Sequence, residues 1–400
     1  MQIIKGNLTT PKGFKVSSLS CGLKESGKHD LALLSSDVPC ISAGTFTVNK
    51  MKSGSVVLTQ KRISKGIAQA MIVNSGNANA CVGKQEIMDA EDITKLASEI
   101  LGIPEKYMLI ASTGIIGRKL PVEKIKNSIG SLVSGLSSKD GSRFSKAIMT
   151  TDTVQKEVAC TIDIGSKRVT IAGVAKGAGM ICPNMATMLS FCTTDAAIEK
   201  AALEEAFKNS VYESFNTITV DGDMSTNDTA IVLANGLAGN DCIKKNSPDH
   251  VKFLNALKYV AKELARKIIL DGEGATRFVD IFVKGAKTDK EAALIAKHVA
   301  SSSLTKTMIA GGDPNWGRIA ASIGSSGADI SKEKTDIYFG KYKVMDNGTG
   351  TSVPRAKLAD IFAKKEINIV IDLKRGKGSY RAWTCDLTEE YVRINAEYET

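Results

Sequence analysis

A chain of 400 residues is longer than one small core needs, so two or three domains or subdomains are expected. Hydrophobic residues make up 43% of the chain and charged residues 24%, which is typical of a folded protein without membrane-spanning runs. The net charge of +10 comes from scattered lysines, and aromatic residues are only 5% of the chain, which argues against a nucleic-acid partner.

Apolar and polar segments alternate between strand-like and helix-like periods along the whole chain, which predicts an α/β or α+β protein. The clearest helix is expected at residues 89–101, where apolar residues recur three and four positions apart. The other predicted elements, in chain order, are strands at 56–58, 70–73 and 108–110, a helix at 122–136, strands at 161–164, 169–171 and 187–191, helices at 196–214 and 251–269, a strand at 278–283, a helix at 289–302 and a strand at 367–371. The boundaries between domains or subdomains are expected near residues 137–142 and 285–290.

Few of the usual catalytic and metal-binding residues are present. The eight cysteines form no C-x-x-C pair, and none stands at ligand spacing from a histidine, so reduced thiols and no zinc are expected. The N-terminus has neither an apolar core nor an Arg-rich stretch, which favours a cytoplasmic protein. The only histidines are His29, His250 and His298, and all three are interpreted as surface residues. A Ser-His-Asp triad is therefore not expected, and a general base must come from elsewhere.

The segment from Lys176 to Phe191 changes character at its middle. Glycines and Pro183 precede Ala186, whereas the residues from Thr187 onward alternate as a half-buried strand. This arrangement fits self-cleavage, in which the Thr187 hydroxyl attacks the Ala186 carbonyl. The freed α-amino group of a threonine titrates near pH 8 and could then serve as the base. A catalytic Cys182 thiol is a weaker alternative, because no histidine stands near it in the sequence.

The segment KGAGMICPNMATML at residues 176–189 resembles the self-processing segment of the ornithine acetyltransferase (glutamate N-acetyltransferase) family. The resemblance runs nearly end to end. Further motifs that match the family are PKGF at 11–14, DVP at 37–39, VNSGNANAC at 73–81, TDT at 151–153, VDGD at 220–223, DPNWGR at 313–318 and YVRINA at 391–396. So many matches in the same order make a chance resemblance implausible.

The resemblance implies a ping-pong acetyl transfer from N-acetylornithine to glutamate. Thr187 would be the nucleophile, released by cleavage between Ala186 and Thr187, and Thr113 with Gly114 would form the oxyanion hole. The residues implied to bind substrate are Thr150, Lys176, Thr187, Glu273, Asn395 and Thr400, with Thr151 as a near alternative to Thr150. Asp313 and Arg318 are lesser candidates, because their segment is expected to be scaffolding.

The family resemblance also implies a four-layer α/β/β/α sandwich with a smaller C-terminal α/β domain. Cleavage would give an alpha chain of residues 1–186 and a beta chain of residues 187–400, assembled as two of each. About 187–284 would complete the sandwich, and about 285–400 would form the smaller domain. No cofactor or metal is expected, and the use of acetyl-CoA as a second donor stays open.

Two other functions compete with this interpretation. A self-processing amidohydrolase or aminopeptidase of the same architecture would use water as acceptor and would not depend on glutamate. A non-enzymatic basic binding protein would remain uncut and would bind nucleic acid in a salt-sensitive way.

Overall fold

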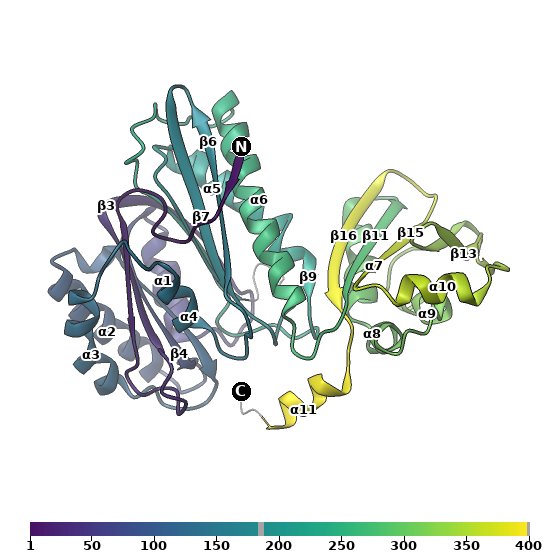
Figure 1. The fold of residues 1–400 in the computed structure, drawn as a ribbon, viewed down its shortest axis with the longest axis horizontal. Coiled ribbons are helices and arrows are strands. Elements are labelled where there is room, and N and C mark those ends of the chain that lie inside the picture. Colours follow the sequence, from purple (N-terminus) through teal and green to yellow (C-terminus); the bar gives the residue numbers. More distant parts are fainter. Residues whose placement is uncertain (183–187, 398–400) are drawn as a thin grey trace.

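The computed structural model describes residues 1–182 and 188–397 and arranges them around two β-sheets (Figure 1). The first sheet has nine strands in the order β1-β6-β7-β8-β10-β3-β4-β5, with β2 paired to β3. Its strands are β1 (Gln2–Ile4), β2 (Phe14–Leu19), β3 (Leu31–Phe46), β4 (Ile67–Asn77), β5 (Met108–Ile115), β6 (Lys156–Ile164), β7 (Lys167–Lys176), β8 (Leu189–Thr194) and β10 (Thr229–Ala234).

The 16-residue strand β3 joins the two halves of this sheet. Its first part pairs with β2 and β4, its last part pairs with β10, and its register with β4 shifts between Ser35 and Cys40. Buried side chains from both halves, including Leu34, Val73 and Phe191, belong to one apolar cluster. The two halves therefore pack face to face as the two inner layers of a sandwich.

Helices cover both outer faces of this sandwich (Figure 1). The helices of the first part of the chain are α1 (Gly54–Ile63), α2 (Gln85–Leu101), α3 (Val122–Ser134), α4 (Ser142–Ile148), α5 (Lys200–Tyr212) and α6 (Pro248–Leu270). One outer apolar cluster joins α2 and α3 to β4 and β5, and the other joins α5 and α6 to β6, β7, β8 and β10. The predicted four-layer α/β/β/α sandwich is confirmed.

The second sheet lies to one side of the sandwich and has seven strands in the order β14-β13-β12-β15-β11-β16-β9 (Figure 1). Its strands are β9 (Ile218–Thr219), β11 (Phe278–Ala286), β12 (Asp336–Phe339), β13 (Tyr342–Asp346), β14 (Thr349–Gly350), β15 (Glu366–Asp372) and β16 (Gly378–Cys385). Its helices are α7 (Asp289–Ser301), α8 (Ser303–Ala310), α9 (Trp316–Gly324) and α10 (Arg355–Phe362). The boundary expected near residue 285 falls at the end of β11, a strand of this second sheet.

The last helix, α11 (Glu389–Glu397), leaves the second sheet and runs back beneath the sandwich (Figure 1). None of its residues is buried. Polar contacts hold it instead, such as the hydrogen bond at 2.7 Å to the Gly274 carbonyl from the hydroxyl of Thr388, the residue just before the helix. The C-terminal segment thus returns to the region where the two parts of the chain meet.

Two local predictions were wrong. Residues 56–58 belong to helix α1 and not to a strand, because Ser53 caps the helix and Val56, Leu58 and Ile63 are buried by packing that outweighs the strand preference of β-branched residues. His250 is not at the surface: its side chain is 3% exposed, and its Nε2 lies 3.0 Å from the Ala202 carbonyl oxygen.

Within residues 1–182 and 188–397, no helix combines the length and the apolar character that crossing a membrane would require.

Candidate active site

A cavity of about 490 Å³ lies at the end of the sandwich to which α11 returns. It is lined by segments far apart in the sequence, from the ends of β5 and β7 to the loops before β10 and after α6, together with α11. The predicted site residues that line it are Thr113, Gly114, Thr150, Thr151, Lys176, Glu273 and Asn395. The structure thus brings together every predicted substrate-binding and oxyanion-hole residue that it describes.

The Thr113–Gly114 turn lies at the end of β5, beside the Asn-rich end of β4. Gly114 has φ 132°, and a Cβ there would lie 2.3 Å from the Gly76 carbonyl carbon. Only glycine fits such a close backbone approach. The amide of Asn227 holds this region by donating to the Ala78 and Ser112 carbonyls at 2.6 and 2.8 Å. The turn is therefore rigid, as an oxyanion hole requires.

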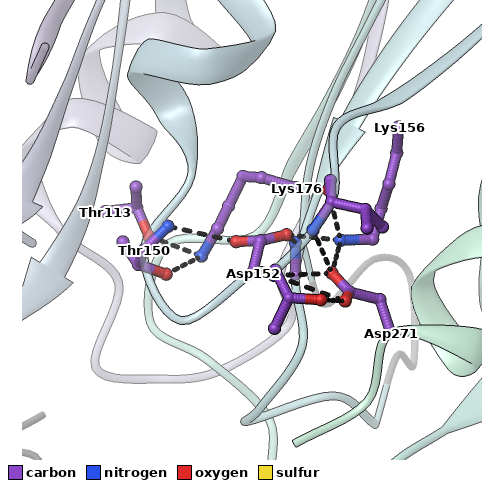
Figure 2. A network of polar contacts seen from close by, with 9 residues as sticks. Thr113, Thr150, Asp152, Lys156, Lys176 and Asp271 are labelled. Carbon is purple, nitrogen blue, oxygen red and sulfur yellow. Dashed lines mark hydrogen bonds and ion pairs between the residues drawn. The ribbon is translucent and has the colours of Figure 1, made fainter. Parts of the chain in front are cut away.

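Lys176, the last residue of β7, places its ammonium group beside this turn (Figure 2). Its Nζ donates to the Thr150 hydroxyl at 2.7 Å and to the Thr113 hydroxyl at 3.3 Å. Burial lowers the pKa of Lys176, and the nearby Lys156 ammonium lowers it as well, while the Asp152 carboxylate opposes both. An ammonium group has three N–H donors, so the third donor of Lys176 can bind a substrate carboxylate or carbonyl oxygen.

A buried ion cluster lies behind Lys176, formed by Asp152, Lys156 and Asp271 (Figure 2). Lys156 Nζ lies 2.6 Å from Asp152 Oδ1 and 2.5 Å from Asp271 Oδ2. Asp152 also accepts from the Gly177 amide at 2.6 Å and from the Thr150 amide at 3.1 Å. The cluster therefore fixes the backbone on either side of Lys176 and Thr150. We refer to it as the Lys156 cluster.

Glu273 lies across the cavity, in the turn that follows Asp271. Its carboxylate accepts from the Asn395 amide of α11 at 2.8 Å, and its backbone amide donates to the Ala178 carbonyl at 2.9 Å. A Cβ on Gly179 would lie 2.3 Å from Glu273 Oε2, so this glycine makes room for the carboxylate. The carboxylate of Glu273, a residue that is 7% exposed, is placed to bind an ammonium group.

The approach to the expected cleavage site is held by Asp221, from the predicted VDGD turn. Its carboxylate accepts from the amides of Met180 and Ile181 at 2.6 and 2.9 Å, and Tyr391 of α11 donates to it at 3.3 Å. Met180 has a left-handed backbone conformation with φ 55°, which residues other than glycine rarely adopt. Ala186 and Thr187, as well as Thr400, lie outside the described residues.

Other predicted candidates lie elsewhere. Asp313 pairs with Arg355 in the second domain at 2.8 Å, and Arg318 donates to the Leu304 carbonyl at 3.1 Å, so neither lines the cavity. Burial raises the pKa of the Cys182 thiol, which disfavours the thiolate.

Sequence reasoning missed four residues around the cavity: Asp152, Lys156, Asp228 and Asp271. Asp152 stands inside the TDT motif, where the implied substrate contact is Thr150 or Thr151, and Asp228 lies five residues after the VDGD motif, for which no role is implied. Lys156 carries no signal in the sequence, because a lysine at the start of a strand is usually exposed.

Most of the charged residues that line the cavity are acidic. Lys176 shares the lining with Asp221, Asp223, Asp228 and Glu273. Within residues 1–182 and 188–397, no group of three His, Cys, Asp or Glu side chains could hold a metal ion. A substrate that carries ammonium groups and a carbonyl to be attacked fits this lining.

The chain is similar to known proteins over nearly its whole length. The model of the ArgJ family matches residues 15–400. The arginine biosynthesis bifunctional protein ArgJ of Caldanaerobacter subterraneus is 46% identical over 404 residues, and that of Symbiobacterium thermophilum is 45% identical over 402 residues, with 100% of both chains covered in each case. The crystal structure of the ArgJ protein of Bacillus halodurans, 43% identical with a TM-score of 0.51, matches 53% of this chain and 100% of its own. Because the family model and full-length relatives span nearly the whole sequence, the chain belongs to the ArgJ family, the bifunctional acetyltransferases of arginine biosynthesis.

Proposed function

We propose that the chain cuts itself before Thr187 and then moves an acetyl group from N2-acetylornithine to glutamate through an acetyl-threonine intermediate. The observation that carries the proposal is the convergence of Thr113, Gly114, Lys176 and Glu273 on one cavity, beside Met188. Residue 187 is bonded to Met188, so the nucleophile is one residue from this lining.

Each residue at the cavity has a different role in such a reaction. The freed amino group of Thr187 takes the hydroxyl proton as the oxygen attacks the acetyl carbon. The Gly114 amide and the Thr113 hydroxyl stabilise the tetrahedral oxyanion, an effect worth about 3–4 kcal/mol per donor in other enzymes. The amino group then gives its proton to the departing ornithine nitrogen, and glutamate attacks the acetyl-threonine in the reverse sense.

Substrate binding uses charges of both signs. Glu273 meets the side-chain ammonium of ornithine, with Asn395 holding the carboxylate in place. Lys176 and Thr150 bind a carboxylate or acetyl oxygen, and Thr400 completes the site. No cofactor is needed for this route, because the acetyl group arrives already bonded to nitrogen. Acetyl-CoA as a second donor is a separate step, which an assay with glutamate and acetyl-CoA alone would reveal.

The length of the Bacillus halodurans chain supports the cut. That chain is matched in full by 53% of the present one, and residues 187–400 make up just over half of the sequence. We also propose that the mature enzyme is an assembly of two alpha chains and two beta chains.

The test combines intact-mass measurement with a transfer assay. The wild-type chain should give two fragments that begin at Met1 and Thr187. Beyond one equivalent per active site, N-acetylornithine should be consumed only when glutamate is present. Thr187→Ala should remain uncut and inactive, whereas Thr170→Ala, a threonine of β7 outside the cavity, should behave as wild type. An uncut wild-type chain with full activity would refute the mechanism. Acetate release without glutamate would instead identify a hydrolase.

A further inference from the structure

The cavity contains a buried acid that the proposed transfer reaction does not use. Asp228 is 2% exposed and precedes strand β10. In the parallel pairing of β10 with β8, Thr229 lies opposite Leu189, so Asp228 and Met188 are the residues just before the paired strands. The Thr229 amide donates to the Met188 carbonyl at 2.9 Å, and the Asp228 carbonyl accepts from the Thr47 amide at 3.0 Å. Asp228 is therefore fixed beside Met188, the second residue after the expected cut.

The carboxyl group of Asp228 is incompletely satisfied. Its Oδ2 is buried and has no hydrogen-bond partner among the residues that the structure describes. Burial raises the pKa of this carboxyl well above its ordinary value, although the Thr47 hydroxyl, the Lys176 charge and the Met188 amide act in the other direction. Burying a carboxyl oxygen without a hydrogen-bond partner costs folding free energy. A functional role in the cavity would explain why this carboxyl is there.

Self-cleavage needs a group that moves a proton before the chain is cut. In the uncut chain the nitrogen of Thr187 is a peptide nitrogen and cannot accept the hydroxyl proton. The histidines do not help, because His29 is exposed, His250 packs against α5, and His298 lies in the second domain. The other acids of the lining are less suited: backbone amides occupy both oxygens of Asp221, Asn395 binds Glu273, and Asp223 is exposed.

We propose that Asp228 carries this proton, taking it from the Thr187 hydroxyl and returning it to the Thr187 nitrogen. The step rests on the self-cleavage proposed above. As the hydroxyl proton passes to the Asp228 carboxylate, the Thr187 oxygen bonds to the Ala186 carbonyl carbon. The carbon–nitrogen bond then breaks, the nitrogen takes the proton from Asp228, and the carboxylate is restored. Water then cleaves the ester, with the new amino group taking the proton, and leaves the Ala186 carboxylate and the Thr187 hydroxyl.

The surroundings of Asp228 make this step dependent on pH. The charged and titratable side chains that line the same cavity are Lys176, Asp221, Asp223, Glu273, Tyr391 and Cys81. Only the ionised form of Asp228 can accept a proton, and burial makes that form scarce and more basic than an ordinary aspartate. The cleavage rate should therefore rise with pH as Asp228 ionises, and then level off.

The experiment follows the cleavage of freshly synthesised chain by intact mass, from about pH 5 to about pH 8. Asp228→Asn keeps the shape of the side chain but cannot carry the proton, so cleavage should slow by roughly 100-fold. The rise of the rate with pH should also disappear. Asp228→Glu keeps the carboxyl group and should restore part of the rate.

Asp280→Asn is the matched control. Asp280 also has a buried carboxyl oxygen without a hydrogen-bond partner among the described residues, but it lies on β11 outside the cavity, so this variant should cleave at the wild-type rate. Thermal unfolding of uncut Asp228→Asn should match that of Thr187→Ala, which shows that the fold is intact. If Asp228→Asn is misfolded, the pH profile of the wild type decides, and a flat profile overturns the proposal. Asp228→Asn that cleaves at the wild-type rate overturns it too, while cleavage of Thr187→Ala would refute the self-cleavage itself.

Discussion

Two ion clusters in the protein have opposite charges at their centres. In the Lys156 cluster, one ammonium lies between two carboxylates, and all three side chains are at most 4% exposed. In the second domain, Asp336 lies between Lys343 and Lys374, at 2.9 and 2.7 Å, and is itself buried. Its two lysines, however, are 36% and 35% exposed. We refer to this second group as the Asp336 cluster.

The two clusters differ in what they hold. The Asp336 cluster closes a surface turn, because Asp336 accepts from the backbone amide of Asn347 at 2.8 Å. The Lys156 cluster instead fixes the backbone at Thr150 and Gly177. One of its members, Asp271, stands two residues before Glu273 in the chain. Charges shielded from water interact strongly and are costly to leave unpaired, whereas exposed pairs are screened. Of these two clusters, the buried one is the one that holds the backbone beside the cavity.

The largest expected effect follows from removing the buried ammonium. Lys156→Met leaves two buried carboxylates without their cation, and breaking such a pair costs about 3–5 kcal/mol of unfolding free energy. Denaturant unfolding of the inactive Thr187→Ala background measures this loss without interference from cleavage. Adding Asp271→Asn to Lys156→Met should recover part of the stability, because one unpaired charge is removed. A loss below about 1 kcal/mol would mean that the two clusters are equivalent.

The Lys156 cluster also shows where sequence reasoning reaches its limit. The resemblance implies roles for Thr113, Gly114 and Lys176 because it covers nearly the whole chain, and Lys176 also begins the segment at residues 176–189. The partners of Lys156 could not be found in this way, since Asp271 lies 115 positions further along the chain. Likewise, the sandwich followed from the family, whereas the fold of β3 across both halves of the sheet depends on pairing between distant strands. Residue type and local spacing carry no record of such contacts.

A loss of intermediate size in the free energy of unfolding is expected at acidic pH. Burial would raise the pKa of Asp152, but Lys176, Lys156 and the Gly177 amide outweigh it and lower the pKa to about 2. Because the folded pKa lies below the unfolded value of about 4, the stabilisation is complete above pH 4 and is lost as the pH falls toward 2. The loss should be about 2 kcal/mol.

Urea unfolding at a series of acidic pH values measures this loss. The Asp336 carboxyl also has a lowered pKa, so the Asp336→Asn variant is needed to separate the two clusters. The decline between about pH 4 and pH 2 should persist in Asp336→Asn and should be reduced in Asp152→Asn. The opposite pattern would assign the acid sensitivity to the second domain.

The smallest effect is expected for the exposed lysines. Lys374→Met removes one of two partners of Asp336, and Lys343 remains to pair with the carboxylate, so the unfolding free energy should fall by less than about 1 kcal/mol. Acetyl transfer should be unchanged, because neither lysine lines the cavity. Salt near 1 M shortens the screening length to about 3 Å and should abolish this small loss. The loss caused by Lys156→Met should persist at the same salt concentration, because ions do not reach a fully buried pair. Equal salt sensitivity of the two variants would contradict the difference in burial on which the comparison depends.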